Sequence, residues 1–227
     1  MKITSKIKHA FISLILIFGF HFHSSAQLFV LDLPPGYNKV ESLNFEKGLD
    51  GSPWLSDTWI PGVAKVTNGK VIKGLKYRYN VYRNQLYFQS DNEIYKISTP
   101  DSIDQVEFDG KKFVYQKSDP LLGNKRFLEV AVDGKAKLFI NYYTEILPPN
   151  YNKALGSGSV NETIIIKKSF LIKVEGLLVV LDKKGKQFSV VFADKKPEIT
   201  AFLKQENISC KEITDVEKVV NYYNSLK

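Results

Sequence analysis

Four two-residue turn signals divide the middle of this chain, and they limit the folds that it can adopt. They are Asn68-Gly69, Asp109-Gly110, Asp133-Gly134 and Lys184-Gly185. Asn-Gly and Asp-Gly pairs supply the positive φ that a tight β-hairpin needs, so these signals predict reversals between neighbouring strands. Turn spacing this regular favours an antiparallel meander, a curved sheet or a partly closed barrel over a parallel sheet.

The segments around these turns alternate in polarity, as half-buried strands do. Apolar side chains at 75, 77, 79 and 81 share one face, and Lys76, Arg78 and Asn80 point to the other. The same pattern predicts further strands at 86–88, 94–97, 103–108, 112–116, 127–132, 137–143, 163–174, 177–181 and 187–192. The central part of the chain is therefore expected to be almost entirely β.

The last part of the chain, from about residue 195 to 227, changes to a helical period. Pro197 suits the first turn of a helix, and apolar residues then follow at helical spacing. Thr214 and Glu217 have the spacing of a capping box at the start of a second helix. We therefore expect a mainly β (α+β) fold whose two C-terminal helices pack on one face or edge of the sheet.

The N-terminus predicts a secretory signal peptide over residues 1–26. Three lysines precede an apolar stretch over residues 11–20, and Ser24 and Ala26 are the small residues expected before a cut at Gln27. An uncleaved anchor is the alternative, but the stretch is shorter than the about 20 residues that a bilayer needs. We expect export to the periplasm or the extracellular space, as a single domain over residues 27–227 without a transmembrane segment.

Cleavage would remove every histidine of the chain, since His9, His21 and His23 all lie within the signal peptide. Without histidine, and with Cys210 as the single cysteine, the mature chain lacks the usual groups for zinc binding and triad catalysis. We therefore expect no metal and no cofactor. Cys210 lies between two apolar-periodic segments, which favours a buried thiol over pairing between chains.

The charge of the mature chain is mildly basic. Loss of the three N-terminal lysines lowers the formal net charge from +8 to +5, and the remaining basic residues are dispersed along the sequence. Nucleic-acid binding usually requires a clustered basic surface, so we do not expect it. Contact with an anionic lipid or polysaccharide remains an alternative to simple solvation of these lysines.

The segment over residues 50–59 is the part of the sequence most like a binding site. It holds both tryptophans, Trp54 and Trp59, together with Asp57 on a loop with Gly and Pro. Exposed indoles can stack on sugar rings, although buried indoles that pin the loop to the sheet are the alternative. In an extended loop the odd spacing would send the two indoles to opposite sides, one into the core and one to a ligand.

Two classes of function remain open on these residues. The first is a non-enzymatic envelope or secreted protein that binds a ligand or an envelope protein, and a scaffold without a ligand is not separable from it. The second is a hydrolase of envelope glycan, which needs two carboxylates about 5–9.5 Å apart. The candidates, which no spacing pairs, are Asp50, Asp57, Asp101, Asp104, Glu107 and Asp109.

Three stretches resemble secreted β-rich proteins of Bacteroidota-type bacteria. They are the Ser-Ser-Ala-Gln cleavage site at 24–27, the run from Gly69 through Lys76-Tyr77-Arg78-Tyr79 to Leu86, and Tyr151-Asn152-Lys153-Ala154-Leu155. The C-terminal helices that end in Asn221-Tyr222-Tyr223-Asn224 are similar too. The resemblance spans most of the mature chain. No activity is established for such proteins, so the resemblance implies only the compartment and the architecture.

Overall fold

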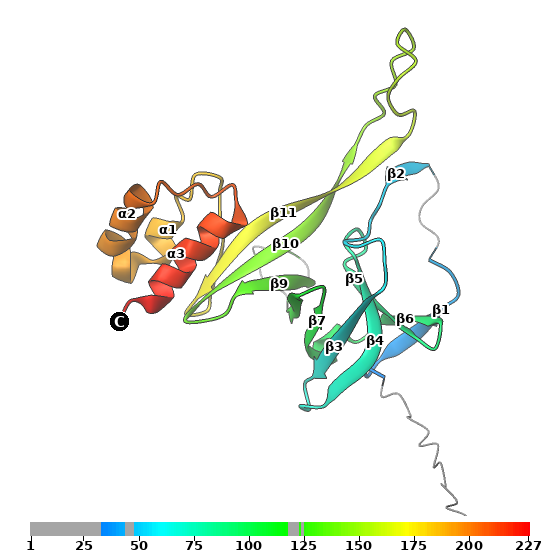
Figure 1. Cartoon of the computed structure of the whole chain (residues 1–227), viewed down its shortest axis with the longest axis horizontal. Coiled ribbons are helices and arrows are strands. Elements are labelled where there is room, and N and C mark those ends of the chain that lie inside the picture. Colours follow the sequence, from blue (N-terminus) through cyan, green and yellow to red (C-terminus); the bar gives the residue numbers. More distant parts are fainter. Residues whose placement is uncertain (1–32, 44–47, 118–122, 124) are drawn as a thin grey trace, which may run out of the picture. The chain divides into compact units, whose positions relative to one another are not determined.

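The computed structural model describes residues 33–43, 48–117, 123 and 125–227. The predicted signal peptide lies outside these residues. Twelve strands of the described chain form one sheet, which is antiparallel except for one short pairing (Figure 1). They are β1 (Tyr37–Val40), β2 (Leu49–Gly51), β3 (Ile60–Val66), β4 (Val71–Asn80), β5 (Gln85–Ser90), β6 (Glu93–Ile97), β7 (Ile103–Phe108), β8 (Lys111–Gln116), β9 (Arg126–Val132), β10 (Ala136–Leu147), β11 (Glu162–Val174) and β12 (Leu177–Val180).

The strands follow one another closely in the sheet, so the predicted antiparallel fold is confirmed as an open sheet. Its order is β1-β6-β5-β4-β3-β7-β8-β9-β10-β11-β12, and β2 pairs in parallel with β11. The turns at Asn68-Gly69, Asp109-Gly110 and Asp133-Gly134 join β3 to β4, β7 to β8 and β9 to β10. Both residues of the Asp109-Gly110 turn have positive φ, 55° and 66°, as a two-residue hairpin requires.

The prediction of a strand at 187–192 is wrong, because this segment forms the short helix α1 (Phe188–Val191). Phe188, Val191 and Phe192 have helical spacing, and all three are buried in one cluster. The preceding Lys184-Gly185 turn is present, with φ of 65° at Gly185. A Cβ at Gly185 would lie 2.4 Å from Cys210 Sγ, so the turn packs too closely on the thiol for another residue.

The strands from β3 to β9 curl around a first hydrophobic core. Tyr77 and Tyr79 of β4 point inward as predicted and are almost fully buried. The Tyr79 ring lies 6.0 Å from the Phe127 ring of β9, although three strands separate β4 from β9 in the sheet order. Asn84 joins the same two regions, since its Oδ1 accepts from the Tyr79 hydroxyl at 2.7 Å and from Phe127 N at 3.2 Å.

The helices form a second core against β9, β10 and β11. The two predicted C-terminal helices are confirmed as α2 (Lys196–Gln205) and α3 (Ile213–Ser225), which lie together with α1 at one end of the β10–β11 hairpin (Figure 1). Stacked rings join them, at 4.1 Å between Phe192 and Tyr223. Asn224 Oδ1 accepts from Ala136 N at 2.7 Å, which fixes the end of α3 to the start of β10.

The predicted capping box is absent, because α3 begins two residues earlier than the pattern indicated. Glu212 occupies the N-cap position without a side-chain capping bond, and Thr214 therefore lies inside the first turn. Asp215 instead accepts from the backbone N–H of Ser209 at 3.0 Å. No helix in the described part of the chain has the length and apolar character needed to cross a membrane.

Candidate functional site

The tryptophan segment lies across β4 and is held there by backbone hydrogen bonds. Leu55 N donates to the Tyr79 carbonyl at 3.0 Å, and Val81 N donates to the Pro53 carbonyl at 2.8 Å. The Trp54 ring meets the Tyr87 ring edge-on, with centroids 5.2 Å apart. The segment is therefore a tightly attached cover of the sheet.

Arg78 brings the two indoles together, which contradicts the prediction that they point to opposite sides. Its guanidinium carbon lies 4.3 Å from the Trp54 ring centroid and 5.6 Å from that of Trp59. The segment is not extended, because the Ser52 and Ser56 hydroxyls accept from the backbone two residues further on, each at 3.3 Å. Partial burial lowers the pKa of Arg78, and the charge of Asp57 opposes this effect.

The three predicted site residues thus lie in one cluster whose aromatic faces are partly occupied. Trp54 and Trp59 are half-buried, and Asp57 is exposed and accepts from the Ser52 hydroxyl at 3.1 Å. The residue that sequence reasoning missed is Arg78. The alternation along residues 75–81 placed Arg78 on the face away from the core, and this was the only pattern in the sequence that could have indicated its role.

The carboxylates proposed for hydrolysis are engaged with different partners on separate elements. Those beyond Asp57 interact with lysines or neutral donors: Asp101 with Lys125, Asp104 with Lys65, Glu107 with Gln105, Asp109 with Lys111, and Asp50 with Ser159 and Asn161. A glycosidase acid needs a raised pKa. Hydrogen bonds from Ser159 and Asn161 instead lower the pKa of Asp50.

A second candidate site is a lysine-lined hollow beside the β10–β11 hairpin, which we call the basic groove. Two adjoining hollows of about 680 and 460 Å³ share Tyr143, Lys168, Lys183 and Lys211. The three lysines come from β11, from the connection between β12 and α1, and from the connection between α2 and α3. Distant parts of the sequence therefore supply one positively charged surface.

The lysines of the basic groove form no ion pair with a carboxylate of the described residues. Lys183 and Lys211 are exposed and form no ion pair there, and Lys168 lies 5.8 Å from the ring of Phe170. Asp182 also lines the groove, but its Oδ1 accepts from two backbone N–H groups, those of Lys184 and Lys186. These bonds lower its pKa against the opposing effect of desolvation, the largest single cause.

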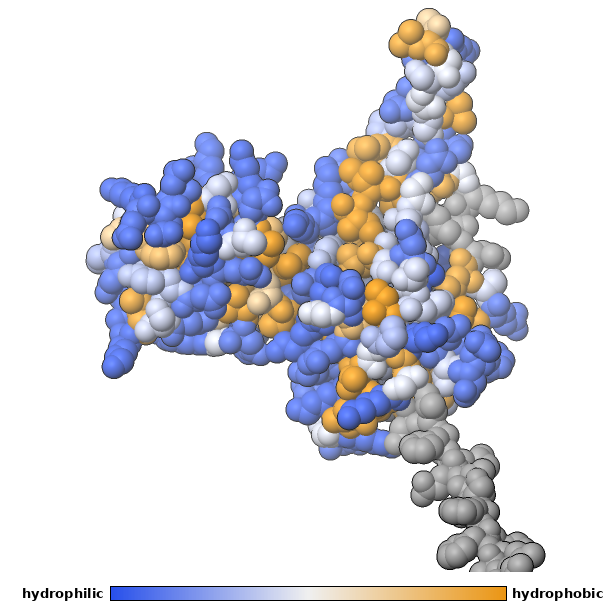
Figure 2. Space-filling model, in the orientation of Figure 1, coloured by the Kyte–Doolittle hydropathy of each residue, from blue (hydrophilic) through white to orange (hydrophobic). Residues whose placement is uncertain are grey.

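Beyond Ile140, one edge of β10 has no partner strand in the described chain, and Tyr143 of this part of the strand also lines the basic groove. β9 pairs with β10 only up to Ile140, whereas β11 pairs with it up to Leu147. Tyr143, Ile146 and Leu147 are 39%, 41% and 37% exposed. Figure 2 shows hydrophobic side chains along this hairpin and at its tip. A further hollow of about 380 Å³ lies at Tyr142–Thr144, lined also by Arg83 and Arg126.

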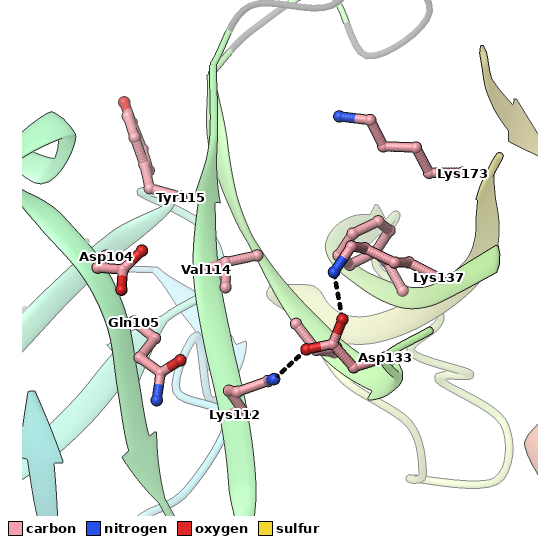
Figure 3. Close-up of a pocket in the computed structure, with 10 residues that line it drawn as sticks. Asp104, Gln105, Lys112, Val114, Tyr115, Asp133, Lys137 and Lys173 are labelled. Atoms are coloured by element: carbon pink, nitrogen blue, oxygen red, sulfur yellow. Dashed lines mark hydrogen bonds and ion pairs between the residues drawn. The ribbon is translucent and has the colours of Figure 1, made fainter. Parts of the chain in front are cut away.

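A third candidate site, which we call the Lys173 hollow, lies on the sheet and is lined by residues of β7 to β11 (Figure 3). It has a volume of about 380 Å³, and its apolar lining is Val114, Val130 and Phe139. Asp133 accepts from Lys112 at 2.6 Å and from Lys137. These hydrogen bonds lower the pKa of Asp133 to about 2.

The described residues contain no cluster of three or more His, Cys, Asp or Glu side chains that could hold a metal ion. The Cys210 thiol in the basic groove is buried as predicted, and desolvation raises its pKa to about 11. It is therefore protonated at neutral pH, whereas the thiolate is the reactive form.

The sequence matches no protein-family model, and comparison with curated proteins and with solved structures likewise gives no match.

Proposed function

We propose that this protein is exported and binds an acidic, extended polypeptide segment along the edge of β10, beside the basic groove. The observation that carries the proposal is an edge of β10 that is unpaired in the described chain, close to three lysines that form no ion pair with any described carboxylate. This interpretation keeps the non-enzymatic binding function expected from the sequence and chooses a protein partner. The tryptophan cluster is then a structural element of the fold.

The strand edge supplies the main-chain half of the interaction. Every second residue at an edge directs its N–H and C=O groups away from the sheet, where an incoming strand can pair with them. Exposed apolar edges promote aggregation, and proteins usually protect them with charges, bulges or covering segments. Tyr143, Ile146 and Leu147 remain exposed at this edge, which is the arrangement expected where a partner covers it.

The lysines supply the preference for an acidic partner. Lys168, Lys183 and Lys211 carry like charges into one concave surface, so an incoming cationic segment would be repelled. A second copy of this chain would bring the same positive charge to the edge. An acidic segment neutralises the groove while its backbone pairs with β10.

Peptide binding tests both halves of the proposal. The probe is a fluorescent decapeptide of alternating Glu and Val, measured by anisotropy at low and physiological salt, with a Lys-Val decapeptide as the charge control. We expect saturable binding of the acidic peptide that weakens as salt rises, and no binding of the basic one. Two further acidic peptides carry N-methyl groups on one or the other alternate set of residues, and at least one should bind ten or more times more weakly.

Charge reversal locates the binding surface. The Lys183→Glu/Lys211→Glu variant should bind the acidic peptide at least ten times more weakly than the wild type. The control is Lys73→Glu/Lys76→Glu, which makes the same charge change on two exposed lysines of β4. Equal effects of the two variants would contradict a local site. Equal binding of all three acidic peptides would contradict strand addition.

A further inference from the structure

The Lys173 hollow contains more positive charge than its two carboxylates use. Asp104, at one side of the lining, pairs with Lys65 outside it at 3.3 Å. The Asp133 carboxylate accepts from the ammonium groups of both Lys112 and Lys137. Lys173 has no ion pair or hydrogen bond among the described residues, and it is half-buried. Figure 3 shows Lys173 extending into the hollow from the side opposite Val114, while Lys112 and Lys137 turn towards Asp133. An ammonium that extends into a hollow without a counter-ion favours an anionic ligand.

The floor beneath this ammonium is apolar and well supported. Val114 and Val130 are only partly buried, and both pack on a cluster of four buried residues: Leu128, Phe139, Leu171 and Leu178. Their exposed surfaces would be removed from water by an aliphatic group in the hollow. The volume of about 380 Å³ lies within the range of small-molecule sites.

We propose that the Lys173 hollow binds a small monocarboxylate with an aliphatic tail. The carboxylate lies against the Lys173 ammonium and the tail covers Val114, Val130 and Phe139. A phosphate monoester fits less well, because one uncommitted ammonium faces it while the charge of Asp133 opposes a second negative charge.

This site is independent of the proposed peptide-binding surface. Phe139, Leu171 and Lys173 alternate along their strands with Leu138, Phe170 and Ile172, which belong to the core beneath the helices. Successive side chains of a strand point to opposite faces, so the Lys173 hollow lies on the sheet face away from the helices. Loss of one binding activity should therefore leave the other intact.

Calorimetric titration of the purified protein with sodium butanoate, hexanoate and octanoate tests the proposal. We expect saturable binding with a stoichiometry of one, strengthened by up to about fourfold for each added methylene. Octanol lacks the charge and octyltrimethylammonium reverses it, so both should bind at least ten times more weakly than octanoate. Octanol equal to octanoate would overturn the role of Lys173, and octyl phosphate binding ten times more tightly would overturn the choice of a carboxylate.

Substitutions place the ligand in the hollow. Lys173→Met should lower octanoate affinity at least tenfold, whereas Lys173→Arg should retain it within about threefold because the charge is kept. Lys73→Met, on an exposed part of β4, is the matched control and should bind as the wild type. Val130→Ser should reduce the gain per methylene, so it should weaken octanoate binding more than butanoate binding. Unchanged octanoate affinity in a folded Lys173→Met protein, verified by its melting curve, would overturn the assignment.

Discussion

The guanidinium carbon of Arg78 lies 4.3 Å from the centre of the Trp54 ring, and Trp59 lies within 5.6 Å of the same carbon. One cation thus holds two indoles that the sequence separates by four residues. Arg78 also donates from Nε to the Ser56 carbonyl at 3.1 Å. Arg78 thus contacts the segment at Trp54, Ser56 and Trp59.

Removal of Arg78 should therefore weaken the fold through both tryptophans. We expect a coupling of about 0.5–2 kcal/mol between Arg78→Met and Trp54→Ala in a double-mutant cycle, the range of cation–π interactions. Chemical denaturation of the two single variants and the double variant measures it. The control cycle replaces Arg78→Met with Lys73→Met, and additivity in both cycles would contradict the contact.

Asn84 should stabilise the fold more than another turn asparagine of the same backbone conformation. Besides accepting from Tyr79 and Phe127, its Nδ2 donates to the Lys125 carbonyl at 2.7 Å. Asn84→Ala should cost about 1–3 kcal/mol more than Asn92→Ala, because it leaves partners unsatisfied. Asn92 is the matched control, with φ of 66° against 49° at Asn84. Equal destabilisation in urea would show that only the turn conformation matters.

The Cys210 thiol should react slowly in the folded protein. Burial raises its pKa to about 11 from an ordinary 9.0, so little thiolate is present at pH 8. Iodoacetamide labelling followed by mass spectrometry should be at least ten times slower in the native protein than in denaturant. Because the folded pKa is the higher one, this group's contribution to stability falls as the pH rises from 9 towards 11. Fast native labelling would place the thiol at the surface.

Asp133 should have a pKa well below that of an ordinary aspartate. Hydrogen bonds from Lys112 and Lys137 lower its pKa to about 2 from 3.8. Since the folded pKa is the lower one, its contribution to stability is present above pH 3.8 and is lost as the pH falls through 2. Carboxyl NMR should show this pKa and its return towards 3.8 in a Lys112→Met/Lys137→Met variant. An ordinary pKa in the wild type would contradict these bonds.

Export should leave a protein that begins at Gln27. Intact mass measured on protein secreted or recovered from the periplasm should correspond to residues 27–227. Replacing Ala26 with a bulky residue such as Phe should block cleavage and leave the longer chain, because signal cleavage needs small residues before the cut. A wild-type chain that still carries residues 11–20 would contradict both export by this route and the absence of histidine.

The sequence predicted most of the sheet because its evidence is local. Alternation along residues 75–81 and the Asp109-Gly110 turn depend on side-chain direction and backbone φ over a few positions, and both appear as expected. The strand β3 was not predicted, because Pro61 and Gly62 interrupt the alternation of apolar and polar residues along it. The segment 187–192 is short enough to fit both the strand period and the helical period. It forms α1, in which Phe188 and Val191 pack in the core with the other helices.

The sequence by itself determined the antiparallel architecture, the helical C-terminus and the buried cysteine, because turn chemistry and hydrophobic period act between close neighbours. Only the tertiary structure decided where the charged groups meet. Lys168, Lys183 and Lys211 become one surface because the helices fold back on β11. Lys173 has no ion-pair partner among the residues that the structure describes, because Asp133 binds two other lysines. Such groupings depend on contacts between residues far apart in the chain, which no local pattern records.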